Sequence, residues 1–219
     1  MKKITMLVVL LTMALTTFAQ EKDVTKFLGI PVDGTKAEMI AKLKEKGFTQ
    51  VDYDEDIVLE GEFNGTEVYV FVVTNNRKVY RIMVADKNKL GEIDIKIRFN
   101  KLCQQFSEND KYLPLDDFTI PENEDISDKI LLYNKRYQAV FYQVDKALVS
   151  KTLLSKYSSE QLANTERLNI EDQIYIAESY QKSSTHKHVW FYISEESSHE
   201  YRITMYYDNI LNQANGDDL

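Results

Sequence analysis

The chain has 219 residues, with 27 lysine and arginine residues against 35 aspartate and glutamate residues and a net charge of −8. With 43% hydrophobic and 28% charged residues, it is neither an intrinsically disordered chain nor an integral membrane protein. Because acidic residues are in excess, the chain lacks the basic footprint of a nucleic-acid-binding protein, and we expect no nucleic-acid partner.

The first nineteen residues are predicted to be a signal peptide. Lys2 and Lys3 precede a mostly apolar run over residues 4–18, which is too short to span a bilayer comfortably. Thr17 and Ala19 supply the small residues that precede a cleavage site. We therefore expect an exported protein, periplasmic or secreted, with no integral membrane segment after cleavage.

A helix over residues 36–46 is the most clearly specified element. Thr35 and Glu38 have the spacing of a capping box, in which the threonine hydroxyl accepts from the third helical N–H and the glutamate reaches back. An apolar stripe follows, and Gly47 fits just past the last turn.

Strands joined by tight turns are predicted next. Asn64-Gly65 is a strong hairpin signal, and Asn75-Asn76 indicates a second turn. Residues 91–107 begin by alternating like a strand, but their apolar residues also line one helical face, and we predict a helix. The expected elements of this part are the strands 58–63, 68–73 and 79–85 and the helix 91–107.

The second half opens with residues 108–128, which are acidic and contain two prolines, so we expect a long loop or a domain boundary there. A hairpin is then predicted around Asn134-Lys135. The expected elements of this half are the strands 129–133 and 137–144, the helices 146–157 and 170–180, and a last hairpin of strands 189–193 and 201–206.

The first hairpin has an echo 121 residues later in the chain. Residues 68–72 (VYVFV) align with residues 189–193 (VWFYI), and Tyr80-Arg81-Ile82 aligns with Tyr201-Arg202-Ile203. A degenerate duplication, with each half a helix and an antiparallel sheet, would explain the match. One continuous domain is the alternative.

The predicted fold class is therefore α+β, with one or more antiparallel sheets and helices packed on one face. The corresponding division of the chain is a signal peptide over residues 1–19, a first unit over residues 20–110 and a second unit over residues 111–219.

The hairpin registers predict which side chains share a face of the sheet. A turn at Asn75-Asn76 places Tyr69 and Phe71 on the face of Tyr80, with Arg81 on the opposite face. We expect the guanidinium of Arg81 to pair with a carboxylate or to stack on a ring, in a structural role.

The corresponding register in the last hairpin places Trp190 and Tyr192 on the face of Tyr201, with Arg202 opposite. We expect Trp190 to be a core residue beneath the helices, because large rings on strands are more often packed than displayed. A displayed aromatic platform is the alternative. The candidate ligand-binding residues are Trp190, Tyr192, Tyr201, Arg202 and Arg81.

No catalytic motif or cofactor loop is present in the sequence. Cys103 has no catalytic context and is expected to be a small core residue. His186 and His188 could share one face of a strand, but His199 is predicted to lie about 20 Å from His188. We therefore predict no catalytic residue, no metal site and no cofactor.

The segment from Phe27 to Gly34, with the helix that follows it to Phe48, resembles a group of exported proteins of gut Bacteroidetes to which no activity is assigned. The similarity extends through residues 98–106 and 207–209 and so covers most of the mature chain. The resemblance implies an envelope or secreted location, and it carries no site residue.

The order of helix and sheet is also similar to that of β-lactamase-inhibitor-protein modules and of a small lipoprotein of the outer-membrane barrel-assembly machine. The absence of a lipid-attachment cysteine departs from the second. The sequence thus favours a non-enzymatic envelope or secreted binding module with a protein or glycan partner. The alternative is a hydrolase that uses paired carboxylates.

Overall fold

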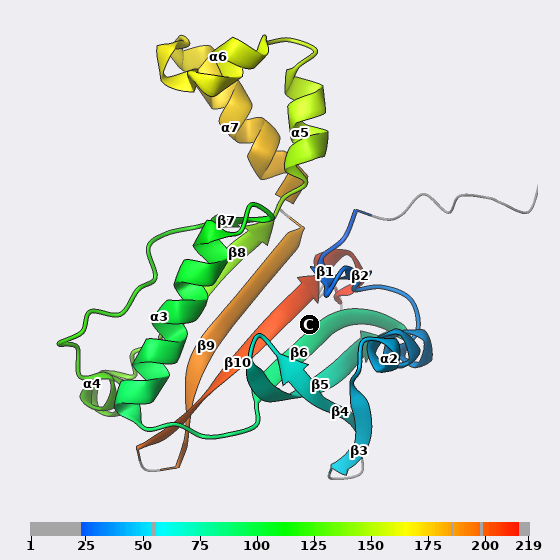
Figure 1. Cartoon of the computed structure of the whole chain (residues 1–219), viewed down its shortest axis with the longest axis vertical. Coiled ribbons are helices and arrows are strands. Elements are labelled where there is room, and N and C mark those ends of the chain that lie inside the picture. Colours follow the sequence, from blue (N-terminus) through cyan, green and yellow to red (C-terminus); the bar gives the residue numbers. More distant parts are fainter. Residues whose placement is uncertain (1–22, 54–55, 185, 198, 215–219) are drawn as a thin grey trace, which may run out of the picture.

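The computed structural model describes residues 23–53, 56–184, 186–197 and 199–214. The predicted signal peptide lies outside these residues. The described part contains a large antiparallel sheet and a two-stranded sheet, with helices packed against the large one (Figure 1). This confirms the predicted α+β class.

The large sheet has eight strands in the order β3-β4-β5-β6-β10-β9-β8-β7, and each neighbouring pair is antiparallel. In chain order, the strands are β3 (Thr49–Tyr53), β4 (Asp56–Phe63), β5 (Thr66–Asn75), β6 (Lys78–Asp86), β7 (Tyr112–Pro114), β8 (Gln138–Gln143), β9 (Lys187–Ser197) and β10 (Glu200–Asn209). The small sheet consists of β1 (Lys26–Phe27) and β2 (Ile30–Pro31).

The helices lie before, between and after these strands. In chain order they are α2 (Lys36–Glu45), α3 (Glu92–Glu108), α4 (Ile126–Tyr133), α5 (Lys146–Leu153), α6 (Ser159–Ala163), the 3₁₀ turn η1 (Thr165–Arg167), α7 (Ile170–Ser184) and the 3₁₀ turn η2 (Ile210–Asn212).

Helix α2 has the predicted capping box. The Thr35 side chain accepts from the Glu38 N–H, and the Glu38 carboxylate accepts from the Thr35 N–H at 2.9 Å. Met39 and Leu43 form its buried stripe. The sequence therefore specified both where this helix starts and which side packs.

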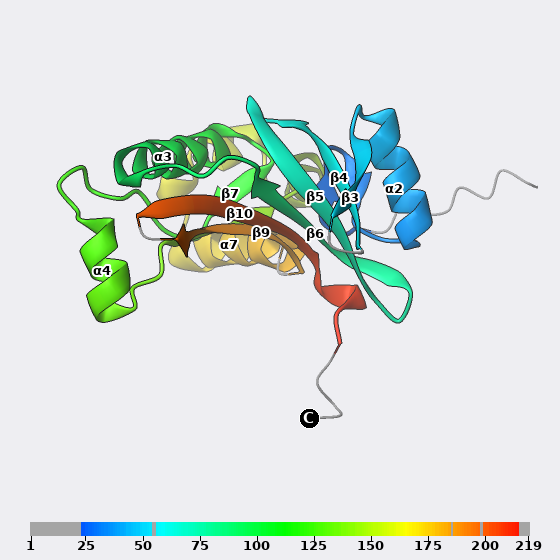
Figure 2. The ribbon, with the colours of Figure 1, turned by 90° about the horizontal axis from the view of Figure 1, so that it is seen from below.

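Helices α2 and α3 cover the same face of the large sheet (Figure 2). The buried stripe of α3 includes Ile95, Phe99 and Phe106, which join one continuous core with the inward-facing strand residues. Phe99 packs edge-on against Phe191 of β9 with ring centroids 5.2 Å apart. We call this covered side the helix face and the opposite side of the sheet the open face.

The predicted register of the first hairpin is wrong. The turn lies at Asn76 and Arg77, which both have positive φ as a type I′ turn requires, and Val72 pairs with Ile82. A turn one residue later keeps the predicted faces together, but the bulge between Val73 and Thr74 reverses them for all pairs beyond it. Arg81 therefore lies on the same face as Phe71, not opposite it.

The same shift affects the last hairpin. Trp190 pairs with Tyr206 and Tyr192 pairs with Thr204, so both rings lie on the open face. Trp190 is half-buried there and is not beneath the helices, which contradicts the expected core position. Tyr201 lies on the helix face and is fully buried.

The two halves of the sheet are arranged about a local two-fold axis. Val72 pairs with Ile82, and the residues 121 positions later, Ile193 and Ile203, pair in the same way. Where the halves meet, Val84 of β6 pairs with Met205 of β10, its own counterpart. This is the register that an internal duplication would give. The strands of both proposed units belong to one sheet.

The prediction of a strand over residues 129–133 is wrong, because this segment is part of helix α4. Asp125 caps the start of α4, and Asn134 adopts a left-handed conformation (φ 50°) at its end. Asn134-Lys135 therefore stops a helix where we expected a hairpin turn.

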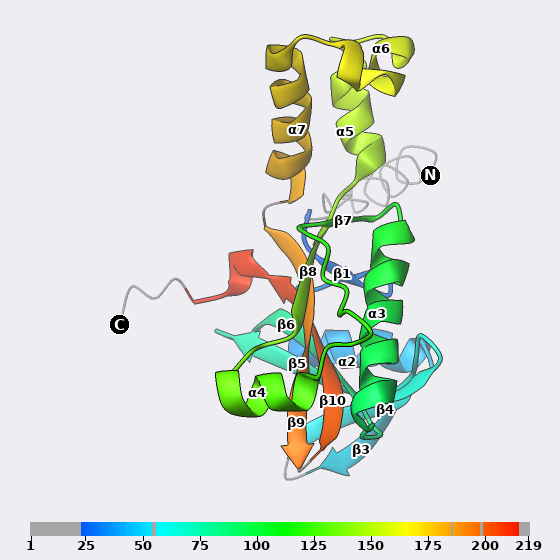
Figure 3. The same ribbon diagram turned by 90° about the vertical axis from the view of Figure 1, so that its left-hand side faces the viewer.

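Helices α5, α6 and α7 form an arm that stands away from the sheet (Figure 3). The arm leaves the sheet between β8 and β9 and has a small apolar cluster of its own, which includes Val149, Leu153 and Ile176. In the first half, the equivalent connection is the tight turn Asn64-Gly65 between β4 and β5.

Cys103 is buried in the main core, and burial raises the pKa of its thiol to about 12. The thiol is therefore protonated at neutral pH, as expected of a core residue. Among the described helices, none is long and apolar enough to cross a bilayer.

Candidate functional site

The open face presents aromatic and charged side chains from five neighbouring strands. Neither α2 nor α3 packs on this side of the sheet. The open-face residues of the central strands are Tyr69, Phe71 and Val73 on β5, Arg81, Met83 and Ala85 on β6, Arg202, Thr204, Tyr206 and Asp208 on β10, His188, Trp190, Tyr192 and Ser194 on β9, and Gln138, Val140 and Tyr142 on β8.

Three rings form the centre of the open face. The ring centroids of Trp190 and Tyr206 are 4.2 Å apart with an interplanar angle of 17°. Tyr192 lies 5.9 Å from Trp190 and 6.0 Å from Tyr206, and its ring is within 22° of parallel to both. All three side chains are half-buried. We call this group the ring cluster.

Asp208 holds the ring cluster and Arg81 together. Its carboxylate accepts from Arg81 Nε at 2.5 Å, from Arg81 Nη2 at 2.8 Å and from Trp190 Nε1 at 2.9 Å. His188 Nε2 lies 3.5 Å from the same carboxylate. The Asp208 side chain is only 4% exposed, so these contacts replace its water.

The electrostatics of Asp208 follow from these contacts. Burial raises the pKa of its carboxyl group, but the hydrogen bonds from Arg81, His188 and Trp190 lower it by more, to about 2. The hydrogen bond to Asp208 likewise raises the pKa of Arg81. The pair is therefore ionised across the physiological pH range.

The Arg81 guanidinium also packs against aromatic rings, 4.7 Å from the ring centroid of Tyr206 and 5.6 Å from that of Trp190. Its expected pairing is thus confirmed in both forms, a carboxylate and a ring. Ion pairing and ring contact together fix the Arg81 side chain against the centre of the open face.

Arg202 is in a different state. It lies on the same face opposite Ser194, and its Nε is buried without a hydrogen-bond partner. Within the part of the chain that the structure describes, its guanidinium forms no ion pair. The expectation that this arginine would pair with a carboxylate or a ring is not met.

A shallow hollow of about 320 Å³ opens beside the ring cluster. Its wall is completed by the end of α4 and the segment after it, which contribute Ile130, Lys135 and Arg136. Lys135 is paired with Glu124. The hollow therefore combines aromatic walls with a partly basic rim.

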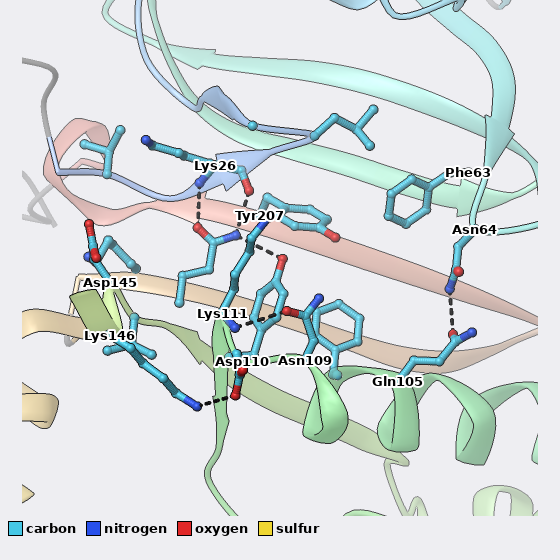
Figure 4. Close-up of a pocket in the computed structure, with 18 of the residues that line it drawn as sticks. Lys26, Phe63, Asn64, Gln105, Asn109, Asp110, Lys111, Asp145, Lys146 and Tyr207 are labelled. Carbon is cyan, nitrogen blue, oxygen red and sulfur yellow. Dashed lines mark hydrogen bonds and ion pairs between the residues drawn. The ribbon is translucent and has the colours of Figure 1, made fainter. Parts of the chain in front are cut away.

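A second, larger concavity of about 900 Å³ lies among β1 and the ends of β4, α3 and β8 (Figure 4). Two ion pairs cross it: Lys146 with Asp110 at 2.9 Å and Lys187 with Asp23 at 2.6 Å. Its polar groups are largely engaged with one another. Gln143, for example, bridges both backbone groups of Lys26.

The titratable side chains of the described residues bear on the hydrolase alternative. No cluster of three side chains that could hold a metal ion is found among them. Each carboxyl group with a resolved pKa shift is shifted downward, whereas a general acid needs a raised pKa. Such carboxylates are acceptors in hydrogen bonds and ion pairs.

Four of the five candidate residues lie together on the open face: Arg81, Trp190, Tyr192 and Arg202. The fifth, Tyr201, is in the core, where its hydroxyl donates to Ser127 Oγ at 2.7 Å. Tyr201 is therefore withdrawn as a candidate.

Sequence reasoning missed Tyr206 and Asp208, and it considered His188 only as a possible metal ligand. The signal that could have found Asp208 is the alternation of β10, since a strand over 200–209 puts its carboxylate on the face of Tyr206. The predicted strand ended at residue 206, so Asp208 lay outside it, and the wrong register placed Trp190 on the opposite face.

No protein-family model, no curated protein and no solved structure matches this chain. The resemblance to exported Bacteroidetes proteins thus stays a prediction, and the open face has to be interpreted from its own chemistry.

Proposed function

We propose that this chain is a non-enzymatic binding module that is exported to the periplasm or beyond and binds a protein partner through the open face. A single observation carries the proposal. The sheet has helices on one face, and the other face carries tryptophan, tyrosine and arginine side chains that remain partly exposed.

The composition of the open face favours a protein partner. Tryptophan, tyrosine and arginine are the residue types that contribute most to protein–protein binding energy. Adjacent strands are about 4.8 Å apart, so the five strands β5, β6, β10, β9 and β8 present a surface about 19 Å wide between the outer strand axes. This breadth suits a protein surface better than one sugar ring.

The ring cluster also leaves little open ring surface for a sugar. Carbohydrate recognition by aromatic residues uses a free ring face. Here the near-parallel rings of Trp190 and Tyr206 pack together, and Arg81 lies over both. Glycan binding is therefore the weaker form of the proposal.

Helix α4 extends the apolar surface at the side of the open face. Leu131, Leu132 and Tyr133 are at least 65% exposed, and Ile130 of the same helix lines the hollow beside the ring cluster. Exposed apolar groups of this size next to an aromatic patch are typical of protein interaction sites.

The hydrolase alternative has no comparable support. Paired carboxylates for hydrolysis need one group with a raised pKa and a second group that is ionised nearby. The most perturbed carboxylate on the open face, Asp208, is held ionised by Arg81. It stabilises the surface and does not serve as an acid.

Site-specific crosslinking tests the proposal. A photoreactive amino acid placed at Tyr192, on the open face, should capture one protein in the native envelope. The same group placed at Ile97, an exposed position on α3 of the helix face, is the matched control and should not capture it. Binding of the purified partner should then weaken at least tenfold in Tyr192→Ala and stay unchanged in Ile97→Ala.

Equal capture at both positions, or equal loss of affinity in both variants, would contradict the proposal. Binding to a glycan array that Tyr192→Ala abolishes would replace the protein partner by a glycan. Export is tested separately, because intact mass of the natively expressed protein should show loss of residues 1–19.

A further inference from the structure

The two arginines of the open face are structural counterparts. Arg81 and Arg202 are 121 residues apart, and the pairs that surround them in the two hairpins have the same register. In addition, β6 and β10 pair about the point where Val84 meets Met205. The two guanidinium groups therefore arise from equivalent backbone positions, and differences between them reflect their neighbours.

The neighbour that differs most is the carboxylate. Asp208 pairs with Arg81, and the position equivalent to Asp208, 121 residues earlier, is Lys87. Lys87 itself pairs with Glu60 at 2.5 Å and lies over the ring of Tyr69. Next to Arg202, Lys87 thus occupies the position at which Arg81 has the carboxylate of Asp208.

No other described acid takes the place of that carboxylate. Glu196 is the nearest acidic residue on the same face of β9, but it accepts from the Ser194 hydroxyl at 2.9 Å and forms no ion pair with Arg202. Because Arg202 Nε is buried and unpaired, it has lost its water without gaining a partner. Such a donor is unfavourable, and the Arg202 residue to which it belongs remains half-buried at the surface.

We infer that Arg202 binds a carboxylate of the partner, from an aspartate or glutamate side chain or from a chain terminus. A guanidinium offers two parallel N–H groups that match a carboxylate. A monoanion fits better than a phosphate dianion, because Glu195, Glu196 and Glu200 are close in sequence on both sides of the β9–β10 turn. This inference rests on the proposed function and assigns the chemistry that the open face recognises.

The inference can be tested without the natural partner. Arginine Nε–H signals of the full chain are followed by NMR while sodium acetate replaces sodium chloride at constant ionic strength, and Arg202→Lys identifies the Arg202 signal. We expect the Arg202 signal to shift saturably, with an apparent affinity about tenfold higher than that of the exposed Arg77. The signal of Arg81 should not move.

Three results would overturn the inference. An Arg202 response no stronger than that of Arg77 would indicate an adventitious ion only. A stronger response to phosphate than to acetate would reassign the ligand. A change in the Arg202 signal in Glu196→Gln before any acetate is added would show that Glu196 already occupies the guanidinium.

The two proposals fail separately. If acetate binds Arg202 but the crosslinker at Tyr192 captures nothing, the proposed function fails and the anion site remains. Only the carboxylate inference fails if the partner is captured, Arg202→Lys binds it with unchanged affinity, and the Arg202 signal of the unsubstituted chain responds to acetate no more strongly than that of Arg77.

Discussion

The two halves of the sheet place an arginine at the same position and complete its surroundings differently. In one half, Arg81 pairs with the buried Asp208 and packs on the rings of Trp190 and Tyr206. In the other half, no carboxylate of the described residues pairs with Arg202, and its Nε is buried and unpaired. One arginine is thus held by its neighbours, whereas the equivalent arginine keeps a buried donor that no described group satisfies.

The largest expected effect is the difference between Arg81→Ala and Arg202→Ala in the free energy of unfolding. Arg81→Ala leaves the Asp208 carboxylate buried without a cation, and we expect it to lower the free energy of unfolding by about 3 kcal/mol. Arg202→Ala removes a buried donor that has no partner, so it should not lower the free energy of unfolding and should leave it unchanged or raise it. Chemical denaturation followed by circular dichroism measures both. Equal losses would show that the halves do not differ.

Acid titration tests the same pair through Asp208. Its pKa is lowered from 3.8 to about 2 in the folded state, so the folded protein gains stability from ionised Asp208 above pH 3.8 and loses it as the pH falls toward 2. The loss should be about 2 kcal/mol. Asp208→Asn removes this contribution, and its unfolding free energy should fall less over the same pH range. Parallel pH profiles would contradict the assignment.

The indole hydrogen bond provides a smaller effect. Trp190→Phe removes the donor to Asp208 and keeps most of the ring, and we expect it to lower the free energy of unfolding by about 1.5 kcal/mol. Tyr192→Phe, at the neighbouring position of the ring cluster, is the control and should change it by less than about 1 kcal/mol. Loss of more than about 3 kcal/mol in Trp190→Phe would indicate a core residue.

The smallest effect concerns the connection between β8 and β9. Replacing residues 145–185 by Asn-Gly would copy the turn that joins β4 to β5, and it keeps the pairing of Tyr142 with His188. Since the arm has its own apolar cluster, we expect the unfolding free energy of the sheet to change by about 1 kcal/mol or less. Loss of a cooperative transition would show that the arm is part of the core.

The sequence predicted the elements better than their pairing. The capping box of Thr35 and Glu38 and the apolar stripe of residues 91–107 are local signals, and the structure confirms both helices. Helix α4 was missed because Asn134-Lys135 resembles a hairpin turn. Short strands such as β7 have too few residues to show alternation.

The site depended on a register that the sequence did not specify. Asn75-Asn76 and Asn76-Arg77 are adjacent turn candidates, and either turn alone would leave Arg81 on the face of Val72. The bulge between Val73 and Thr74 places Arg81 on the face of Phe71. Both faces of these strands carry apolar side chains, so hydrophobic alternation could not decide. The pairing of β10 with β6, which the sequence does not indicate, is what brings Asp208 beside Arg81.

The most direct test of the open face uses the only tryptophan of the chain. Incorporation of 5-fluorotryptophan gives one ¹⁹F signal, from Trp190. We predict that this signal shifts between H₂O and D₂O in the free protein, and that it shifts or broadens when the partner captured at Tyr192 is added, with no change in Tyr192→Ala at the same partner concentration. A signal that is insensitive to both solvent and partner would show that the open face is covered and is not the binding surface.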